Sequence, residues 1–439
     1  MRGRFFLVCL GCPKNEVDTE GMATLLQNAG WRQAAQPESA DLIIVNTCGF
    51  IRPAREESYE VLLELARSKR KGQRFIAVGC LAQLDPEGLR LRVPELDGTL
   101  GTRDWSTIVE YVATLSDHST DQRVGAGTRP TGSLVTPVQR RVSSASAYIK
   151  IADGCSASCA FCAIPRIKGP QCSKDVHAVL TEARELVGQQ VREIILIAQD
   201  TTAYGRDRGE HDALPQLIED ILEVVPELTW LRILYAYPHH LSERLIELLA
   251  SRPQLCHYLD LPLQHAHPDT LRRMNRPHDV ERVHRLIGDL RHAVPDIALR
   301  TTFIVGFPGE TDEEFEMLLS FMSDCQFDRV GIFVFSPEDG TAAAVLPNRI
   351  PPQLAQERYE EAMALQQRIS YRRNQAQVDR VLQVLVEGTQ AGLSVGRSYR
   401  DAPEIDGYVL VRGRHPVGQV IEARITRALE YDLEAEPAG

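Results

Sequence analysis

Short apolar runs alternate with amphipathic stretches over the first 115 residues. Runs of strand type and stretches of helical spacing follow one another in the order 5–10, 18–29, 41–46, 54–69 and 74–79. Alternating strands and helices predict a parallel sheet that is covered on both faces. We therefore expect a doubly wound parallel α/β domain over residues 1–118.

The middle of the chain repeats a strand and a helix six times. The candidate strands begin at Tyr148, Glu193, Trp230, Tyr258, Leu299 and Arg329. Six repeats are too few to close an eight-stranded barrel, so we predict an open (β/α)6 partial barrel over residues 141–371. The stretch before it is rich in Ser, Thr, Gly and Pro, which predicts a linker at 119–140.

The last 60 residues change in character. After a helical stretch at 352–374, apolar and polar residues alternate in four short runs at 380–387, 393–399, 408–412 and 418–427. Glycines and prolines separate these runs. The pattern predicts a small antiparallel β-barrel over residues 374–439.

Composition and charge narrow the class of protein. The 439 residues are 43% hydrophobic and 25% charged, which is typical of a soluble globular protein, and no apolar run approaches the length of a membrane helix. The net charge of −11 disfavours non-specific binding to nucleic acid. The N-terminus fits a strand better than a signal peptide, so we expect a cytoplasmic chain with no membrane association and with reduced cysteines.

Three cysteines follow the three predicted N-terminal strands. Cys12, Cys48 and Cys80 are 36 and 32 residues apart, which is about one strand–helix–strand unit. The carboxyl ends of neighbouring parallel strands meet at one edge of a sheet, where open α/β sheets bind ligands. The spacing therefore predicts that three thiolates converge and hold an iron–sulfur cluster, with ordinary buried cysteines as the alternative.

A second group of cysteines lies within eight residues. Cys155, Cys159 and Cys162 have the spacing C-x-x-x-C-x-x-C directly after a predicted strand. Three cysteines on a four-iron cluster leave one iron open, and an amino-carboxylate can chelate it. Structural zinc is the weaker alternative because it requires a fourth ligand and usually a second C-x-x-C pair.

This second motif, with Phe161 before its last cysteine, resembles that of the radical S-adenosylmethionine enzymes. The resemblance implies that the open iron binds the methionyl end of S-adenosylmethionine and that one electron cleaves it to a deoxyadenosyl radical. It also implies cofactor contacts for Phe161, for Gln199 after the second strand, and for Gly306 after the fifth. The histidines of His239-His240 and His265-x-His267 lack a carboxylate at ligand spacing, so we expect them to shape the substrate pocket.

The three regions in this order resemble the methylthiotransferases, and the C-terminal region resembles their TRAM domain. The resemblance implies two 4Fe-4S clusters, one on Cys12, Cys48 and Cys80 and one on Cys155, Cys159 and Cys162. The motifs around the first three cysteines, Gly11-Cys12-Pro13-Lys14-Asn15, Asn46-Thr47-Cys48-Gly49 and Gly79-Cys80-Leu81-Ala82, resemble the RimO-type branch. Tyr235-Ala236-Tyr237-Pro238-His239-His240 does so too.

That branch adds a methylthio group to the β-carbon of an aspartate in the twelfth small-subunit ribosomal protein, free or on the ribosomal subunit. The resemblance implies that one S-adenosylmethionine donates the methyl group, that a second is the radical source, and that sulfur is delivered through the auxiliary cluster. An electron donor such as flavodoxin or ferredoxin is implied as a partner. A tRNA adenosine methylthiotransferase and a two-cluster electron-transfer protein remain as alternatives.

The charge of the C-terminal region provides an independent indication. Residues 375–439 contain seven Arg, no Lys and ten Asp and Glu, which gives a net charge of −3. A tRNA-binding barrel should present a basic face, whereas an acidic barrel complements a basic ribosomal protein. We therefore expect little tRNA binding and predict that Asp401, Glu404 and Asp406 form an exposed docking loop, unless they only solvate the surface. A second acidic cluster expected to contribute to docking consists of Glu430, Asp432, Glu434 and Glu436.

Overall fold

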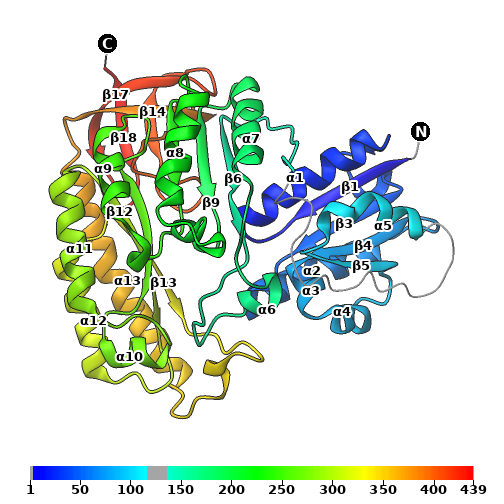
Figure 1. Cartoon of the computed structure of the whole chain (residues 1–439), viewed down its shortest axis with the longest axis horizontal. Coiled ribbons are helices and arrows are strands. Elements are labelled where there is room, and N and C mark those ends of the chain that lie inside the picture. The colour runs from blue at the N-terminus through cyan, green and yellow to red at the C-terminus, as the bar shows by residue number, and fades with distance from the viewer. Residues whose placement is uncertain (1–2, 116–135, 439) are drawn as a thin grey trace.

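The computed structural model describes residues 3–115 and 136–438. An N-terminal lobe lies beside a larger central body, and the C-terminal barrel packs on the end of that body (Figure 1). Among the described helices, none is long and apolar enough to cross a membrane. The predicted linker falls mostly outside the described residues, and the domain boundaries remain predictions.

The N-terminal lobe is a five-stranded parallel sheet with the order β2-β1-β3-β4-β5. Its strands are β1 Arg4–Cys9, β2 Arg32–Gln33, β3 Leu42–Thr47, β4 Arg74–Gly79 and β5 Gly98–Gly101. Its helices are α1 Pro13–Asn28, α2 Arg52–Arg67, α3 Cys80–Leu84, α4 Pro86–Arg92 and α5 Ile108–Thr114. Separate apolar cores cover its two faces, one under α1 and α5 and one under α2 and α4. The doubly wound prediction is confirmed.

The central body contains six parallel strands in chain order. They are β6 Ser146–Lys150, β9 Glu193–Ile197, β10 Trp230–Ile233, β11 Tyr258–Gln264, β12 Ala298–Val305 and β13 Arg329–Val334. The strands form two three-stranded sheets, β10-β9-β6 and β11-β12-β13, which meet at β10 and β11 without a continuous ladder. The order 6-9-10-11-12-13 is that of the predicted open partial barrel.

Helices cover the outside of this partial barrel (Figure 1). They are α7 Val176–Gly188, α8 Ala213–Val224, α9 Glu243–Ser251, α10 Pro268–Arg273, α11 Val280–Ala293, α12 Asp312–Cys325 and α13 Pro352–Gln375. Their apolar residues and those of the strands form one large core. The short elements β7 Ala152–Asp153, α6 Ile164–Lys168 and β8 Cys172–Ser173 lie on either side of the cysteine loop.

The C-terminal region is a closed five-stranded barrel with the order β14-β15-β16-β18-β17. Its strands are β14 Val381–Gln390, β15 Leu393–Arg397, β16 Val409–Arg412, β17 Val420–Ala428 and β18 Leu433–Pro437. The sequence pattern missed β18, and the pair β16–β18 is parallel in an otherwise antiparallel barrel. The predicted small barrel is confirmed with one additional strand.

The acidic loop of this barrel does not face solvent as predicted. Asp401 is 1% exposed and bonds Arg329 of β13 at 2.6 Å. Asp406 has its side chain buried, accepts a hydrogen bond from the Tyr258 hydroxyl at 2.6 Å and pairs with Arg300 at 3.4 Å. Of the three acids, only Glu404 is exposed. The prediction of a three-residue docking loop is therefore wrong, because two of its carboxylates fasten the barrel to the central body.

Candidate metal centres

The N-terminal cysteines lie at the carboxyl ends of three neighbouring strands. Cys12 precedes α1, Cys48 follows β3, and Cys80 begins α3 directly after β4. A Cβ on Gly11 would lie 3.0 Å from the Cys48 sulfur, so the Cys12 loop approaches Cys48 closely. Burial, with smaller contributions from the charges of Cys12 and Cys48, raises the pKa of the Cys80 thiol to about 12, while Lys168 opposes the rise. The three cysteines thus lie at one edge of the sheet, at the ends of neighbouring strands.

Two asparagines hold this group of loops in place. Asn15 donates from Nδ2 to the carbonyls of Leu10 at 2.8 Å and Thr47 at 3.2 Å, and its Oδ1 lies 3.6 Å from the Cys80 sulfur. Asn46 donates to the carbonyl of Asn15 at 3.0 Å. The asparagines thus tie the loop after β1 to the ends of β3 and β4. The sequence places both asparagines within the cysteine motifs but does not indicate this structural role.

The second cysteine group occupies one loop between β7 and α6. Its turn begins at Gly154, which has a φ of +78° and where a Cβ would lie 2.2 Å from the Pro170 carbonyl oxygen. The Ala157 amide donates to the Cys155 sulfur at 3.4 Å, and Arg276 donates to the Cys159 sulfur at 3.7 Å. Burial raises the pKa of the Cys162 thiol to about 12, and the Cys159 and Cys155 charges add to the rise.

The sulfur spacing fits a cluster better than a single ion. One tetrahedral zinc with bonds of about 2.3 Å would hold its sulfurs roughly 3.8 Å apart. In the described residues, neither cysteine group brings its three sulfurs within 4.8 Å of one another. Three thiols per group, spaced more widely than one zinc ion requires, match the donor set of a 4Fe-4S cluster with one open iron.

A different trio, His267, Asp269 and Glu314, is close enough to hold one ion. Glu314 is already engaged, because Arg273 pairs with it at 2.5 Å and Thr270 donates to it at 2.9 Å. The guanidinium group beside this carboxylate disfavours a cation there. His265 bonds Glu310 at 3.0 Å, a carboxylate 45 residues away in the chain that the sequence spacing around the histidines did not indicate.

The two cysteine groups lie on opposite sides of one interface. Cys80 packs against Ala163, the residue after Cys162, and against Ile167 of α6. Beside this contact, Lys168 reaches Asp18 of α1 at 3.5 Å and Asp153 at 3.3 Å. Lys150 pairs with the same two carboxylates, at 2.5 and 3.0 Å. Although burial lowers the pKa of Lys168, Asp153 and Asp18 raise it above its usual range.

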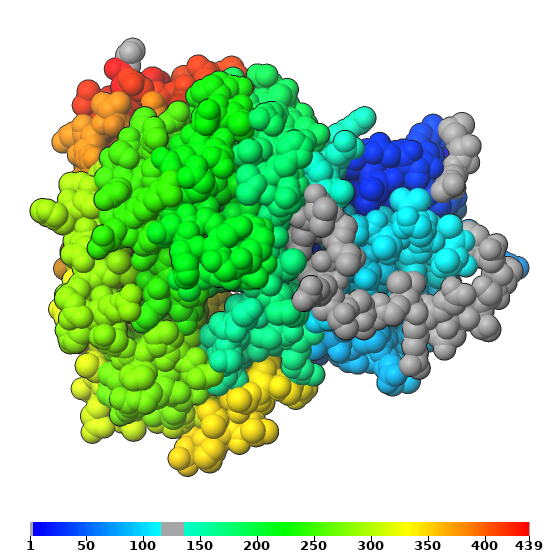
Figure 2. Space-filling view, viewed as in Figure 1, coloured from blue at the N-terminus to red at the C-terminus, as the bar shows by residue number. Residues whose placement is uncertain are grey.

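Figure 2 shows the N-terminal lobe against the side of the central body, with the surface hollowed next to the blue-green cysteine segment. The buried residues Asp18, Asp153, Lys150 and Lys168 form a compact group, here called the four-charge lock. Because α1 begins one residue after Cys12 and Asp153 lies two residues before Cys155, the lock fixes one cysteine group relative to the other.

Three family descriptions match consecutive regions of the chain. They are the uncharacterized protein family UPF0004 at residues 4–101, the radical SAM superfamily at 149–322 and the TRAM domain at 378–437. The ribosomal protein uS12 methylthiotransferase RimO of Roseiflexus castenholzii is 48% identical over 99% of this chain and 96% of the relative. The RimO of Chloroflexus aurantiacus is 50% identical over 99% of both chains. The chain belongs to the RimO family.

Solved structures share the fold over most of the chain. The radical S-adenosylmethionine methyltransferase TsrM of Kitasatospora setae has a TM-score of 0.61 at 15% identity, covering 78% of this chain and 75% of that protein. The cobalamin-dependent radical enzyme OxsB has a TM-score of 0.53 at 13% identity, covering 83% and 56%. These similarities show the fold. The family assignment shows an enzyme of the radical S-adenosylmethionine class, with which an iron–sulfur cluster and S-adenosylmethionine are associated.

The predicted cofactor residues lie around the second cysteine group. Phe161 packs in a small apolar cluster with Phe307, which directly follows Gly306. The Gly306 amide donates to Glu310 at 2.7 Å, so its N–H is already bonded. Gln199 donates to Asp153 at 3.1 Å, and its Oε1 is buried without a partner among the described atoms. Cofactor contacts by Phe161, Gln199 and Gly306 remain predictions.

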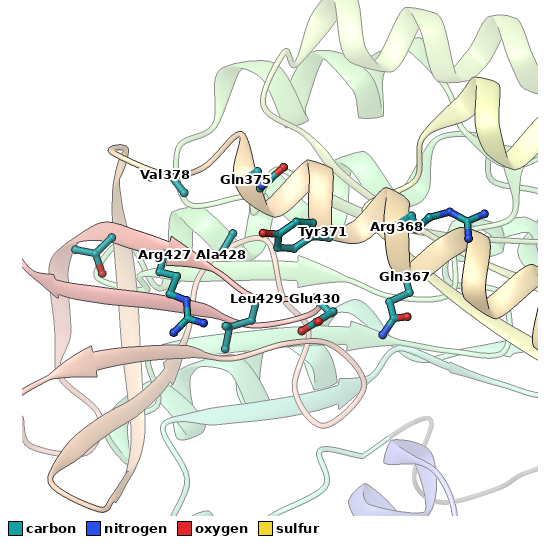
Figure 3. Close-up of a pocket in the computed structure, with 10 residues that line it drawn as sticks. Gln367, Arg368, Tyr371, Gln375, Val378, Arg427, Ala428, Leu429 and Glu430 are labelled. Carbon is teal, nitrogen blue, oxygen red and sulfur yellow. The ribbon is translucent and has the colours of Figure 1, made fainter.

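Of two hollows in the structure, one lies next to the second cysteine group and the other lies away from both groups. A small cavity is lined by Tyr237, His239, His265 and Arg276, and Arg276 also stacks over the Tyr237 ring at 4.3 Å. This cavity adjoins Cys159 through Arg276, which fits the expected role of the histidines in shaping a pocket. An open groove of about 550 Å³ lies instead between α13 and β17, and its lining includes Tyr371 and Arg368 of the helix and Arg427 of the strand (Figure 3). It contains none of the predicted site residues.

Proposed function

We propose that this enzyme methylthiolates the β-carbon of an aspartate in ribosomal protein uS12. The names of its relatives, which are 46–50% identical over almost the whole chain, support this substrate. The observation that carries the proposal is the packing of Cys80 against Ala163 and Ile167, because it brings two cysteine groups to one interface. A tRNA adenosine substrate is disfavoured by these names and by the acidic barrel.

The proposal assigns a 4Fe-4S cluster to each cysteine group. Cys155, Cys159 and Cys162 would hold the cluster whose open iron binds S-adenosylmethionine, and Cys12, Cys48 and Cys80 would hold the auxiliary cluster. When bound, these groups supply a one-electron reductant for S-adenosylmethionine and the sulfur that reaches the substrate carbon. Such chemistry is required because an aspartate β-carbon has no lone pair and no useful acidity beside a carboxylate.

The residues of the chain position these groups and exclude water. Arg276 and the Ala157 amide donate to sulfurs of the second group, and hydrogen bonds of this kind stabilise thiolate ligands. The four-charge lock holds the two groups at a fixed separation, which serves a transfer that requires alignment to within about an ångström. We further propose a small electron-transfer protein, such as flavodoxin or ferredoxin, as the reductant.

Intact mass spectrometry of uS12 tests the proposal. The anaerobically reconstituted enzyme is incubated with S-adenosylmethionine, a reductant and either small ribosomal subunits or uS12 alone. We expect uS12 to gain one methylthio group in place of one hydrogen. Cys155→Ala should abolish the gain, whereas Cys325→Ala, a buried cysteine outside both groups, should retain it. Modification of tRNA adenosine with unmodified uS12 would overturn the proposal.

A further inference from the structure

Lys14, two residues after Cys12, is a buried lysine that forms no ion pair within the described residues. Its side chain lies in the first turn of α1, is 8% exposed, and holds Nζ 3.3 Å above the centre of the Tyr235 ring. Across the described residues, no hydrogen-bond acceptor is within bonding distance of this ammonium group. An aromatic face stabilises a desolvated cation by only about 2 kcal/mol, much less than a paired carboxylate in such a site.

The other buried lysines are paired. Lys150 and Lys168 both bond Asp18 and Asp153, and Lys174 bonds Glu182. Lys14 therefore differs from every other lysine that is buried in the described part of the chain. Because buried charges are almost always paired, this exception indicates a site that another molecule completes.

The acids nearest to Lys14 already have partners. Burial lowers the pKa of Lys14, and the negative charges that oppose this shift are those of Cys12, Asp260 and Asp153. Asp260 pairs with Arg300 at 2.9 Å and accepts the Tyr235 amide at 3.2 Å, and Asp153 belongs to the four-charge lock. Neither carboxylate is within bonding distance of Lys14. The chain thus surrounds Lys14 with acids that are engaged elsewhere.

The position of Lys14 relates it to the reaction. Tyr235 follows β10 at the carboxyl end of the parallel strands, where the cysteine loop also lies, and Lys14 reaches this edge from the N-terminal lobe. Tyr235 adopts a φ of +61°, a strained conformation that its hydrogen bond to Asp260 maintains. The ammonium group therefore lies where the N-terminal lobe meets the carboxyl end of β10, two residues along the chain from Cys12.

We infer that Lys14 binds the carboxylate of the substrate aspartate. The inference rests on the proposed function, and it explains how the β-carbon is positioned, because that carbon is directly bonded to the carboxylate carbon. A paired ammonium group would also distinguish aspartate from asparagine, whose neutral amide gains no ion pair. Lys14 thus acts as a specificity-determining residue that the N-terminal lobe contributes to a substrate site in the central body.

Binding of two peptides to the full-length reconstituted enzyme tests the inference. One peptide spans the target aspartate of uS12, and the other carries asparagine in its place. The wild type should bind the aspartate peptide roughly 10- to 100-fold more tightly, the range expected for a charged hydrogen bond. Lys14→Met, which removes the ammonium group and keeps an unbranched side chain, should bind both peptides equally. Lys14→Arg should retain part of the preference, and Lys71→Met, an exposed lysine on the same lobe, should retain all of it.

Iron content and S-adenosylmethionine affinity separate the alternatives. If Lys14 instead balances the charge of a cluster on Cys12, Lys14→Met loses iron and keeps the peptide preference, which overturns the inference. If Lys14 binds the carboxylate of S-adenosylmethionine, the variant loses affinity for that cofactor alone, with the same consequence. If the wild type methylthiolates uS12 and binds both peptides equally, only the inference fails. If the wild type leaves uS12 unmodified, the proposed function fails first.

Discussion

The two cysteine groups differ in how the chain brings them together. The N-terminal group draws one cysteine from each of three strands, and its members are 36 and 32 residues apart. The second group lies within eight residues of one loop, all partly exposed, whereas Cys48 and Cys80 are buried. The first group therefore exists only when a whole domain is folded, while the geometry of the second is largely local.

The two cysteine groups therefore depend on different parts of the structure. Hydrogen bonds from Asn15 and Asn46 across three strands hold the N-terminal group, so a disturbance anywhere in that sheet reaches it. The second group depends on one tight turn and on donors from nearby loops. The following predictions test whether the centres can be lost separately.

Removing each group of thiols should have the largest effect. With all six cysteines present, reconstitution should give about eight irons, as two four-iron clusters require. Changing Cys12, Cys48 and Cys80 together to Ala should leave about half and still permit reductive cleavage of S-adenosylmethionine. Changing Cys155, Cys159 and Cys162 should leave the other half and abolish cleavage. Full iron content in the first triple variant would refute the N-terminal assignment.

Disrupting the four-charge lock should loosen the relative placement of the two cysteine groups. Asp18→Asn leaves Lys150 and Lys168 sharing one carboxylate in a buried site, which should destabilise the protein by about 3–5 kcal/mol. A lower midpoint in chemical denaturation would measure this loss. Methylthiolation should fall more than cleavage of S-adenosylmethionine. Glu56→Gln, in an exposed pair with Arg92, should leave the midpoint unchanged, and an equal decrease in both variants would contradict the role of the lock.

Two glycines allow each centre to be disturbed alone. Gly79 has a φ of +98°, and a Cβ there would lie 2.2 Å from Asn46 Oδ1 and 2.7 Å from the Thr47 carbonyl oxygen. Gly79→Ala should cost about 1–3 kcal/mol and lower iron at the N-terminal group, whereas Gly154→Ala should lower it at the second group. Gly188→Ala, which has open space, should lower neither. Iron analysis in the background of each triple cysteine variant separates the two sites.

The smallest effect concerns the exposed acid of the barrel loop. Glu404→Lys should slow association with basic uS12 by a few-fold and flatten its dependence on salt, because exposed charges mainly steer encounters. Stopped-flow binding at several salt concentrations would measure this change. Cleavage of S-adenosylmethionine without substrate should not respond. A change in cleavage would indicate that Glu404 acts on the radical centre.

The fold could be predicted from the sequence because hydrophobic periodicity and the spacing of strands are local signals that repeat along the chain. Counting one strand–helix–strand unit between Cys12, Cys48 and Cys80 was sufficient to place them at one sheet edge. The same reasoning could not place Asp401, because its partner Arg329 is 72 residues away and in another domain. It also missed β18, whose five residues complete the barrel by a parallel pairing. Lys14 is part of the motif around Cys12, but only the folded structure shows that no carboxylate pairs with it.

The C-terminal barrel bridges the two three-stranded sheets of the central body, which are separated between β10 and β11. Arg397 bonds Glu193 of β9 at 2.5 Å on one sheet. On the other sheet, Asp406 bonds Tyr258 of β11 and Asp401 bonds Arg329 of β13. The barrel contributes no cysteine, yet it bridges the discontinuity in the sheet that supports the radical centre. The three regions match separate family descriptions, but buried contacts join them in one structure. Deleting the barrel would remove Arg397 from Glu193, which keeps Arg232, and Asp401 from Arg329, so the central body would lose a buried ion pair in each of its two sheets.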